Sequence, residues 1–281
     1  LIDRSQSRNM SKAVMAKSSV YQSKTSGNKG VINWSEEENQ IWAELYAKQL
    51  PLLKTRACSQ YMEGLSLLAL PDDRIPQLPD IDKVLLAQTG WKTAEVPALI
   101  NFGEFFRLLA NKQFPVATFI RSKDEFDYLQ EPDIFHEVFG HCPLLTNPAF
   151  AHFTHTYGKL GLAASKEDRI YLARLYWFTV EFGLVRSKAN PETLEIYGGG
   201  ILSSPGETLY ALESGEAIRK PLKAIDALRT PYRIDIMQPL YYILPDFDYL
   251  FELADMDIMS LVNKAKGLGL YPALFDAKKQ A

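Results

Sequence analysis

The chain has 281 residues, of which 47% are hydrophobic, and its formal net charge is −3. This hydrophobic fraction is enough for a large core, and a slightly acidic chain lacks the basic surplus of a nucleic-acid binder. Only Cys58 and Cys142 are present, which excludes a disulfide framework and favours the cytoplasm, and no run reaches the roughly 18 to 20 apolar residues of a membrane span.

The N-terminal segment differs in composition from the rest of the chain. Residues 1–30 are rich in Ser, Lys, Gln and Asn and contain few large apolar side chains. Such a segment buries too little surface to offset its ordering entropy, so we predict a flexible tail. Met10 is a candidate native start, and residues 1–9 a candidate cloning remnant. No repeat and no second linker follow, which predicts one domain over residues 31–281.

Helical patterns dominate that domain. Acids at 36–38 after Ser35 indicate a helix start, because acids stabilise the first turn, and the pattern continues to Leu50. Further helices are predicted at 54–69, 81–89, 101–111, 168–185 and 204–214, a short strand at 114–120, and a strand or loop at 193–197. The predicted fold class is therefore mainly α with minor short β strands, an α+β arrangement.

The histidines point to a metal site. All four lie between positions 136 and 155, and imidazole is the commonest protein ligand for transition metals. His136 and His141 are five residues apart, which on a continuous α-helix places them about 140° apart. We expect Gly140 to end the helix in the left-handed conformation and Pro143 to prevent continuation, so that both imidazoles converge on one ion.

Glu181 is the best third ligand. Its helical neighbours at three and four residues are large and apolar: Trp177, Phe178, Leu184 and Val185. Burying a carboxylate without a partner costs several kcal/mol, and a metal ion with two imidazoles offers such a partner. Two histidines and one carboxylate form the facial triad of non-haem Fe(II) oxygenases, which leaves positions open for O2 and substrate.

Other interpretations of these residues remain open. The histidine pair could be structural, and Glu181 could pair with Arg174 instead of a metal. His152 and His155 are alternative ligands, although surface or supporting positions suit them better, and Cys142 between apolar neighbours is better explained as a buried inert thiol. A zinc hydrolase is a distant alternative because its His-Glu-x-x-His pattern is one residue shorter than the one here. A binding module with a structural metal would have a closed coordination sphere.

Four blocks carry a family resemblance: EPDIFHEVFGH at 131–141, YWFTVEFGL at 176–184, YGGGILSSPGE at 197–207 and QPLYY at 238–242. Their order and spacing resemble the catalytic domain of the pterin-dependent aromatic amino acid hydroxylases, over roughly residues 31–260. Within that family the chain is most similar to the short bacterial members that hydroxylate phenylalanine. The resemblance implies L-phenylalanine, O2 and a tetrahydropterin (tetrahydrobiopterin or a bacterial analogue) as partners, with tyrosine or tryptophan as alternative substrates.

The resemblance also implies residue roles. His136, His141 and Glu181 would bind Fe(II). Substrate binding would involve an arginine that clamps the carboxylate, an aspartate that holds it, an aromatic residue on the substrate ring and two pocket residues: Arg121, Asp133, Trp177, Gly200 and Ser203. The pterin would be bound by Leu99, Ile100, Phe105, Glu137 and Tyr176. Without the resemblance, core packing would be preferred for Phe105, Tyr176 and Trp177.

The ends of the chain bear on assembly and regulation. Residues 261–281 show no sustained heptads of the kind that form a tetramerisation helix, so we expect a monomer without membrane or nucleic-acid partners. About 30 polar residues before the domain are too few for the regulatory domain of the animal enzymes. Allosteric activation by phenylalanine is therefore not expected.

Overall fold

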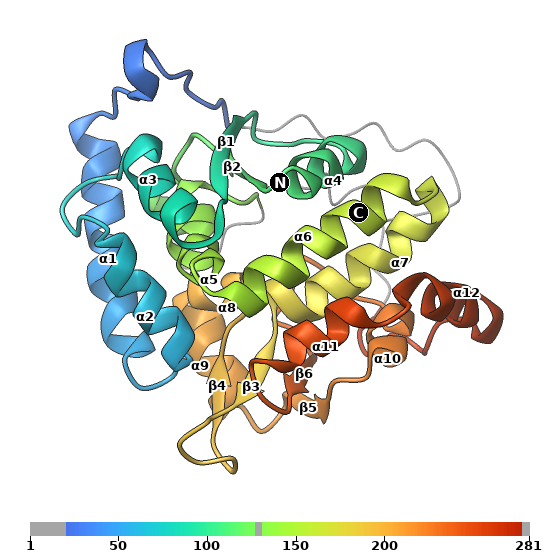
Figure 1. The fold of residues 1–281 in the computed structure, drawn as a ribbon. Coiled ribbons are helices and arrows are strands. Elements are labelled where there is room, and N and C mark those ends of the chain that lie inside the picture. The colour runs from blue at the N-terminus through green and yellow to red at the C-terminus, as the bar shows by residue number, and fades with distance from the viewer. Residues whose placement is uncertain (1–20, 127–130, 277–281) are drawn as a thin grey trace.

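Helices surround two small β-sheets in the computed structural model, which describes residues 21–126 and 131–276 (Figure 1). The α-helices are α1 (Glu36–Leu53), α2 (Ser59–Leu68), α3 (Leu78–Thr89), α4 (Phe102–Ala110), α5 (Cys142–Leu145), α6 (Pro148–Ala163), α7 (Lys166–Tyr176), α8 (Gly199–Leu202), α9 (Pro205–Glu213), α10 (Ala224–Arg229), α11 (Tyr249–Asp255) and α12 (Ile258–Leu268). Short 3-10 turns lie at Asn28–Gly30 (η2) and Lys123–Glu125 (η3), and two π-helices at Phe135–His141 (η4) and Trp177–Glu181 (η5).

The strands form one pair and one four-stranded sheet. β1 (Lys92–Val96) and β2 (Gln113–Ala117) run parallel, joined by α4. The larger sheet has the order β4 (Leu194–Ile196), β3 (Leu184–Arg186), β6 (Leu240–Leu244), β5 (Ile218–Pro221). In it, β3 pairs with β4 antiparallel, and β6 pairs with β3 and β5 in parallel. The prediction of a mainly helical fold with short strands is confirmed.

The start of α1 shows why its sequence forms a helix there. Ser35 Oγ accepts a hydrogen bond from the Glu38 N–H at 3.1 Å, and the Glu38 carboxylate accepts one from the Ser35 N–H at 2.7 Å. This capping box satisfies two backbone donors that have no partner within the helix. The helix runs past the predicted end at Leu50 to Leu53 and includes Pro51.

Two predicted helices are wrong in part. The predicted helix 54–69 begins only at Ser59. Just before it, Ala57 forms a β-bridge with Ile196 of β4, and the Cys58 N–H donates to the Ile196 carbonyl. The predicted helix 168–185 starts at Lys166 but leaves the α conformation after Tyr176 and reaches β3 by Leu184. In both cases, backbone hydrogen bonds to residues distant in sequence set the helix boundary. A local sequence pattern does not reveal these partners.

The N-terminal segment is another difference. The composition predicts a flexible tail over 1–30, yet Tyr21 stacks on Phe119, with ring centroids 4.6 Å apart at 13°, and the Lys24 N–H donates to the Thr118 carbonyl at 2.8 Å. The Tyr21 ring and the Lys24 backbone hydrogen bond join this segment to the folded domain. The average composition of residues 1–30 does not reveal these contacts. Residues 1–20 lie outside the described residues, so the remaining part of that prediction stays a prediction.

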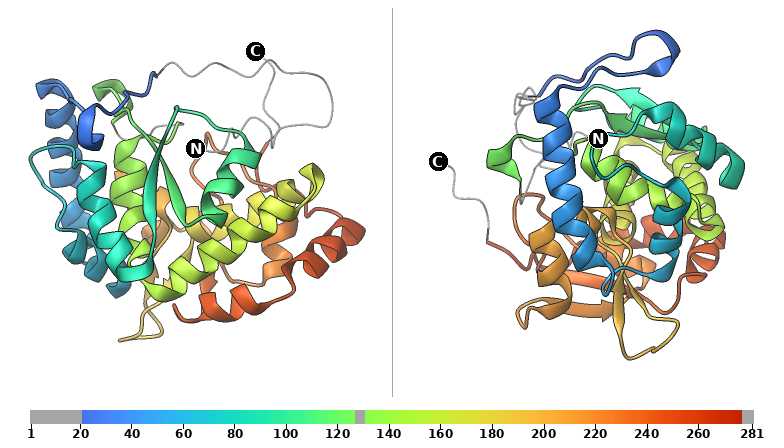
Figure 2. Two further views of the ribbon diagram at one scale, coloured as in Figure 1. Left: turned by 45° about the horizontal axis from the view of Figure 1, so that its top comes forward. Right: turned by 90° about the vertical axis from the view of Figure 1, so that its left-hand side faces the viewer.

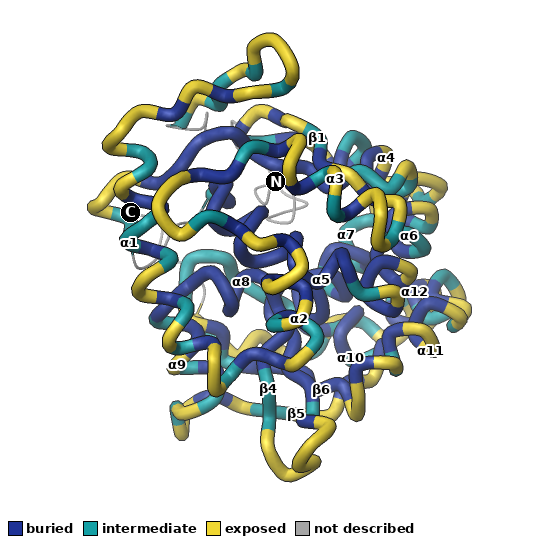
Figure 3. Tube along the Cα trace, turned by 60° about the vertical axis from the view of Figure 1, so that its left-hand side comes forward, coloured by how far each residue is buried: buried dark blue, intermediate teal, exposed yellow. Residues whose placement is uncertain are grey.

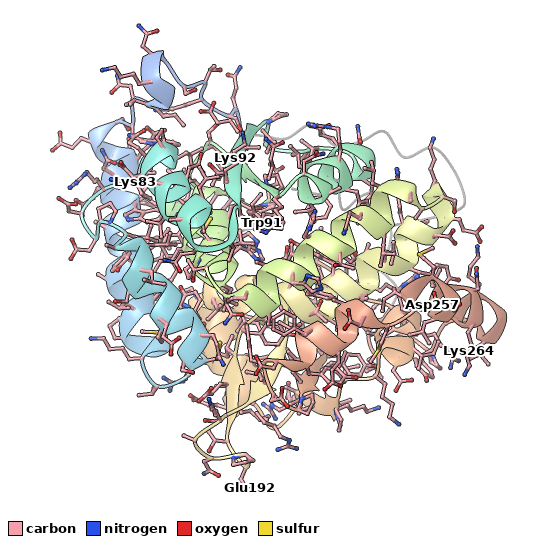
Figure 4. The ribbon with its side chains drawn as sticks, in the orientation of Figure 1. Lys83, Trp91, Lys92, Glu192, Asp257 and Lys264 are labelled. Atoms are coloured by element: carbon pink, nitrogen blue, oxygen red, sulfur yellow. The ribbon has the colours of Figure 1, made fainter. Side chains whose placement is uncertain are left out.

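Helices α5 and α8 lie near the centre of the fold (Figure 1), and every residue of η4, α5 and α8 is buried. Helices α1 and α2 lie on one flank and α10 and α12 on the opposite one (Figures 1 and 2). In Figure 3 the buried positions run through the centre and the exposed ones lie on the rim, and in Figure 4 charged side chains such as Glu192 and Lys264 point away from the body. Within residues 21–126 and 131–276, no helix combines the length and the apolar character that crossing a bilayer requires.

Candidate metal centre and substrate pocket

The π-helix η4 carries both histidines. Its backbone pairs residues five apart, as in the hydrogen bond from the Cys142 N–H to the Glu137 carbonyl. This wider turn brings residues five apart onto one face of the helix, so His136 and His141 converge without a break. π-Bulges of this kind are frequent at functional sites.

The predicted helix end at Gly140 is therefore wrong. Among the described residues, the glycines with positive φ are Gly30, Gly90 and Gly269, and the chain continues from η4 directly into α5. Pro143 lies in the first turn of α5, where a missing N–H costs nothing. Gly140 serves close packing instead, because a Cβ there would lie 2.7 Å from the Gly199 carbonyl oxygen.

Glu181 ends the second π-helix, η5. The Phe182 N–H donates to the Trp177 carbonyl at 2.9 Å, again across five residues. Glu181 is 5% exposed, as its apolar neighbours predict. Two of those neighbours, Leu184 and Val185, lie on β3 and not on the same helix as Glu181. The predicted burial of Glu181 is right, but the prediction that these two residues are its helical neighbours is wrong.

The three predicted ligands meet. The Nε2 atoms of His136 and His141 are 3.0 Å apart, and Glu181 Oε2 lies 3.3 Å from the first and 3.5 Å from the second. All three residues are buried, and their donor atoms form a group that could hold one ion. Ligand bonds of about 2.1 Å at right angles put neighbouring donor atoms about 3.0 Å apart. The group therefore fits one face of a coordination sphere.

Hydrogen bonds prepare His136 for a metal. Ser203 Oγ donates to the Gly199 carbonyl at 2.8 Å, which leaves its lone pairs to accept from His136 Nδ1 at 2.9 Å. With its proton on Nδ1, the ring presents the Nε2 lone pair to an ion. Burial lowers the pKa of His136 against the opposing effect of the Glu181 charge, which favours the neutral, metal-binding form. The donor set of two imidazoles and one carboxylate suits iron(II).

Arg121 and Asp133 form a buried pair beside this centre. Asp133 Oδ2 accepts from Arg121 N and Nε, and Oδ1 accepts from Arg121 Nη2, each at 2.9 Å. The His136 N–H also donates to Oδ1 at 2.9 Å. Burial alone raises the pKa of Asp133, but the Arg121 charge and these hydrogen bonds hold that pKa below its usual value. Asp133 thus connects the arginine to the backbone of a metal ligand.

A pocket opens beside His136 and contains the predicted substrate residues. Four of the five predicted substrate residues line it, namely Arg121, Trp177, Gly200 and Ser203. The fifth, Asp133, does not line the pocket but accepts a hydrogen bond from Arg121 Nε. The Trp177 indole is held by stacking on Tyr232, with centroids 4.4 Å apart at 15°. Its Nε1–H donates to Gln238 Oε1 at 3.0 Å. The indole face is therefore fixed beside the metal group.

The predicted pterin residues occupy several elements. Phe105 on α4 meets Tyr176 at the end of α7 edge to face, with centroids 5.2 Å apart at 88°. Leu99 and Ile100 precede α4, and Glu137 is buried on η4 next to His136. The structure brings Phe105 and Tyr176 into contact, and the pterin-binding role of all five residues stays a prediction.

Several alternatives can now be weighed against the structure. Arg174 packs over the Tyr171 ring, while Glu181 Oε2 lies beside the two histidines. His155 Nε2 hydrogen-bonds the Ala110 carbonyl at 3.1 Å, away from the triad. Cys142 is fully buried and burial raises the pKa of its thiol, as an inert thiol requires.

Further pocket residues had no predicted role. They are Glu131, Pro132, Phe182, Ser204, Glu207 and Ile234. Five of the six lie within four residues of a predicted site residue, on either side of it, and this proximity in sequence was the signal available. Ile234 carried no such signal because it follows α10 in an irregular segment, distant in sequence from the triad.

Comparisons with known proteins agree with this geometry. Residues 5–256 match the family model described as biopterin-dependent aromatic amino acid hydroxylase. A phenylalanine-4-hydroxylase of Vibrio cholerae is 57% identical over 260 residues, covering 92% of this chain and 89% of that protein. The apo structure of the cold-active phenylalanine hydroxylase from Colwellia psychrerythraea superposes with a TM-score of 0.87 at 59% identity, covering 90% of this chain and 97% of that one.

A structure with bound metal is also similar. Phenylalanine hydroxylase from Chromobacterium violaceum with bound oxidised Fe(III) superposes with a TM-score of 0.82 at 41% identity, covering 87% of this chain and 88% of that one. The family match over residues 5–256 includes the triad and the residues that line the pocket. The chain therefore belongs to the biopterin-dependent aromatic amino acid hydroxylases.

Proposed function

We propose that the protein is a phenylalanine 4-monooxygenase, which converts L-phenylalanine to L-tyrosine with O2 and a tetrahydropterin at a non-haem Fe(II) site. One observation carries the proposal: His136, which meets His141 and Glu181 in one group of possible ligands, lines a pocket that also holds a buried arginine and a fixed indole. The names of the bacterial relatives support phenylalanine as the substrate.

The three ligands have a defined task. His136, His141 and Glu181 hold Fe(II), which when bound supplies the activation of O2 for aromatic hydroxylation. Ser203 fixes the His136 ring through Nδ1, and Gly199 lets the His141 ring lie against the backbone, since a Cβ at Gly199 would be 2.3 Å from His141 Cε1. The protein would thus supply three ligands from rigid positions to the iron.

Arg121 binds the substrate carboxylate. A guanidinium has five N–H donors, and three of them are used by the bonds to Asp133 and to the Phe126 carbonyl. The remaining two, one on each terminal nitrogen, suit a carboxylate, which accepts two parallel hydrogen bonds. Because Asp133 holds the guanidinium in a buried position, the clamp is ordered before the substrate arrives.

Trp177 and the pterin residues orient the reactants. The Trp177 face packs on the substrate ring, and Tyr232 and Gln238 prevent the indole from rotating. Phe105 stacks on the pterin, with Leu99, Ile100, Glu137 and Tyr176 completing the wall on that side. Most of these side chains are buried, Leu99 and Tyr232 being partly exposed, which favours a cavity from which water is excluded and protects the reaction from side products.

Three further points belong to the proposal. Residues 31–281 act as one catalytic domain, the protein is a monomer, and it works in the cytoplasm. Two free buried cysteines support a reducing compartment. Light scattering of the purified protein tests the monomer, and a tetramer mass would contradict it.

Product analysis tests the reaction. The protein is incubated in air with Fe(II), a tetrahydropterin and, separately, phenylalanine, tyrosine or tryptophan, with and without a chelator. Tyrosine formation from phenylalanine that needs the pterin and stops with the chelator is the expected result. Product from tryptophan or tyrosine alone would reassign the substrate, and no product from any of them, with zinc in the protein, would support a zinc hydrolase.

A further inference from the structure

Glu207 is a buried acid in the substrate pocket that has no assigned role so far. It lies in the first turn of α9, is 1% exposed, and lines the same pocket as Arg121, His136 and Trp177. A carboxylate is kept in such a position only with partners, because an unpaired buried charge is costly. The partners of its two oxygens therefore indicate what it does.

The two oxygens of Glu207 differ. Oε1 accepts the Gln238 N–H at 3.1 Å and a hydrogen bond from the Tyr241 hydroxyl. Oε2 is buried and has no hydrogen-bond partner in residues 21–126 and 131–276. Burial raises the pKa of Glu207 against the lowering effect of those two donors. One oxygen is thus anchored, and the other could accept a hydrogen bond from a molecule in the pocket.

The substrate supplies the missing partner. L-Phenylalanine is a zwitterion at neutral pH, and Arg121 accounts only for its carboxylate. Its α-ammonium has three N–H donors and must leave water when the amino acid enters the pocket. We propose that Glu207 Oε2 accepts the α-ammonium of the substrate, so that Arg121 and Glu207 together select an α-amino acid. This inference rests on the proposed function and names the group that recognises the substrate's amine.

Glu131 is the competing acid in the pocket. It also lines the cavity, but it is only half-buried, and it lies beside Pro132 in the loop that precedes η4. A half-buried carboxylate keeps part of its hydration and gains less from an ammonium than a fully desolvated one does. Glu207 is anchored through Tyr241 and Gln238, so a hydrogen bond to it loses less conformational entropy.

Binding measurements on two ligands test the proposal. The iron-loaded protein and its variants Glu207→Gln and Glu131→Gln are titrated by calorimetry with L-phenylalanine and with 3-phenylpropanoate, which lacks the amine. Loss of a hydrogen bond between charged groups predicts that Glu207→Gln binds L-phenylalanine about 10- to 100-fold more weakly. Its affinity for 3-phenylpropanoate should change less than about twofold, because that ligand has no ammonium.

The outcomes separate the possibilities. If Glu207→Gln keeps the wild-type preference for L-phenylalanine over 3-phenylpropanoate, the assignment is wrong, and if Glu131→Gln loses that preference instead, the ammonium belongs to Glu131. Glu207→Asp retains the charge and should recover part of the preference, which keeps the test decisive if Glu207→Gln folds poorly. Absence of tyrosine formation by the wild type would refute the proposed function but not the binding preference, so the two failures are distinguishable.

Discussion

The Arg121–Asp133 pair offers a quantitative test of the buried clamp. The Arg121 side chain is 3% exposed and that of Asp133 0%. Asp133→Ala removes the acceptor for three Arg121 N–H groups and for the His136 N–H, and leaves a guanidinium charge buried. Removing one partner of a buried pair costs about 3–5 kcal/mol, which is a large part of the 5–15 kcal/mol that stabilises a typical domain.

The assay is urea unfolding at pH 7, followed by tryptophan fluorescence. The midpoint should fall for Asp133→Ala with an unchanged slope, corresponding to a loss of about 3–5 kcal/mol. The matched control is Glu104→Ala, which breaks the Glu104–Arg107 pair, whose side chains are 39% and 50% exposed. That exposed pair should contribute no more than about 1 kcal/mol.

A double variant separates the pair from the individual side chains. Once Arg121→Ala has removed the charge, Asp133→Ala should cost less than it does in the wild type, since no buried guanidinium remains without a partner. An Asp133→Ala protein within about 1 kcal/mol of the wild type, or strictly additive effects in the double variant, would refute the reasoning.

Further predictions concern the metal centre and pH. Ser203→Ala removes the acceptor for His136 Nδ1 and should lower Fe(II) affinity about 10- to 100-fold in a chelator competition; an unchanged affinity would show that Ser203 does not orient the ring. Gly199→Ala should displace His141 and abolish stoichiometric iron binding, whereas Gly215→Ala, where an added Cβ meets nothing within 4 Å, should bind iron as the wild type does. Because the pKa of folded Asp133 is lowered, its contribution to stability is present above the unfolded pKa of about 3.9 and should be lost as the pH falls through the lower folded value; urea midpoints from pH 7 to 3 should decline less in Asp133→Ala than in the wild type.

The sequence was sufficient to predict the chemistry of the site but not its backbone. Residue types revealed the triad, because two histidines and a carboxylate among apolar neighbours have few alternatives in a chain with four histidines. The π-helices that make His136 and His141 converge have no sequence signal of their own, since an i→i+5 pattern arises from packing rather than from local propensity. The helical periodicity therefore led to a break at Gly140 that does not exist.

Long-range pairing limited the prediction of the fold in the same way. Leu184 and Val185 continue an apolar helical pattern, but they pair with Ile243 and Leu244 on β6. Such pairing costs loop-closure entropy and becomes favourable only in the complete fold. It therefore cannot be predicted from a short stretch of neighbouring residues. Tyr21 differs from prediction in the opposite direction. The polar composition around it predicts a flexible segment, but its ring stacks on Phe119 of the folded domain.

The most direct test of the account measures iron and product in the same samples. Wild type and Glu181→Ala are titrated with Fe(II) under anaerobic conditions, and tyrosine formation from L-phenylalanine is then measured after adding a tetrahydropterin and air. We predict that the wild type binds one iron per chain and forms tyrosine in proportion to the iron bound. A folded Glu181→Ala protein should bind iron more weakly and form no tyrosine. A Glu181→Ala protein that binds one iron and forms tyrosine at the wild-type rate would contradict the triad.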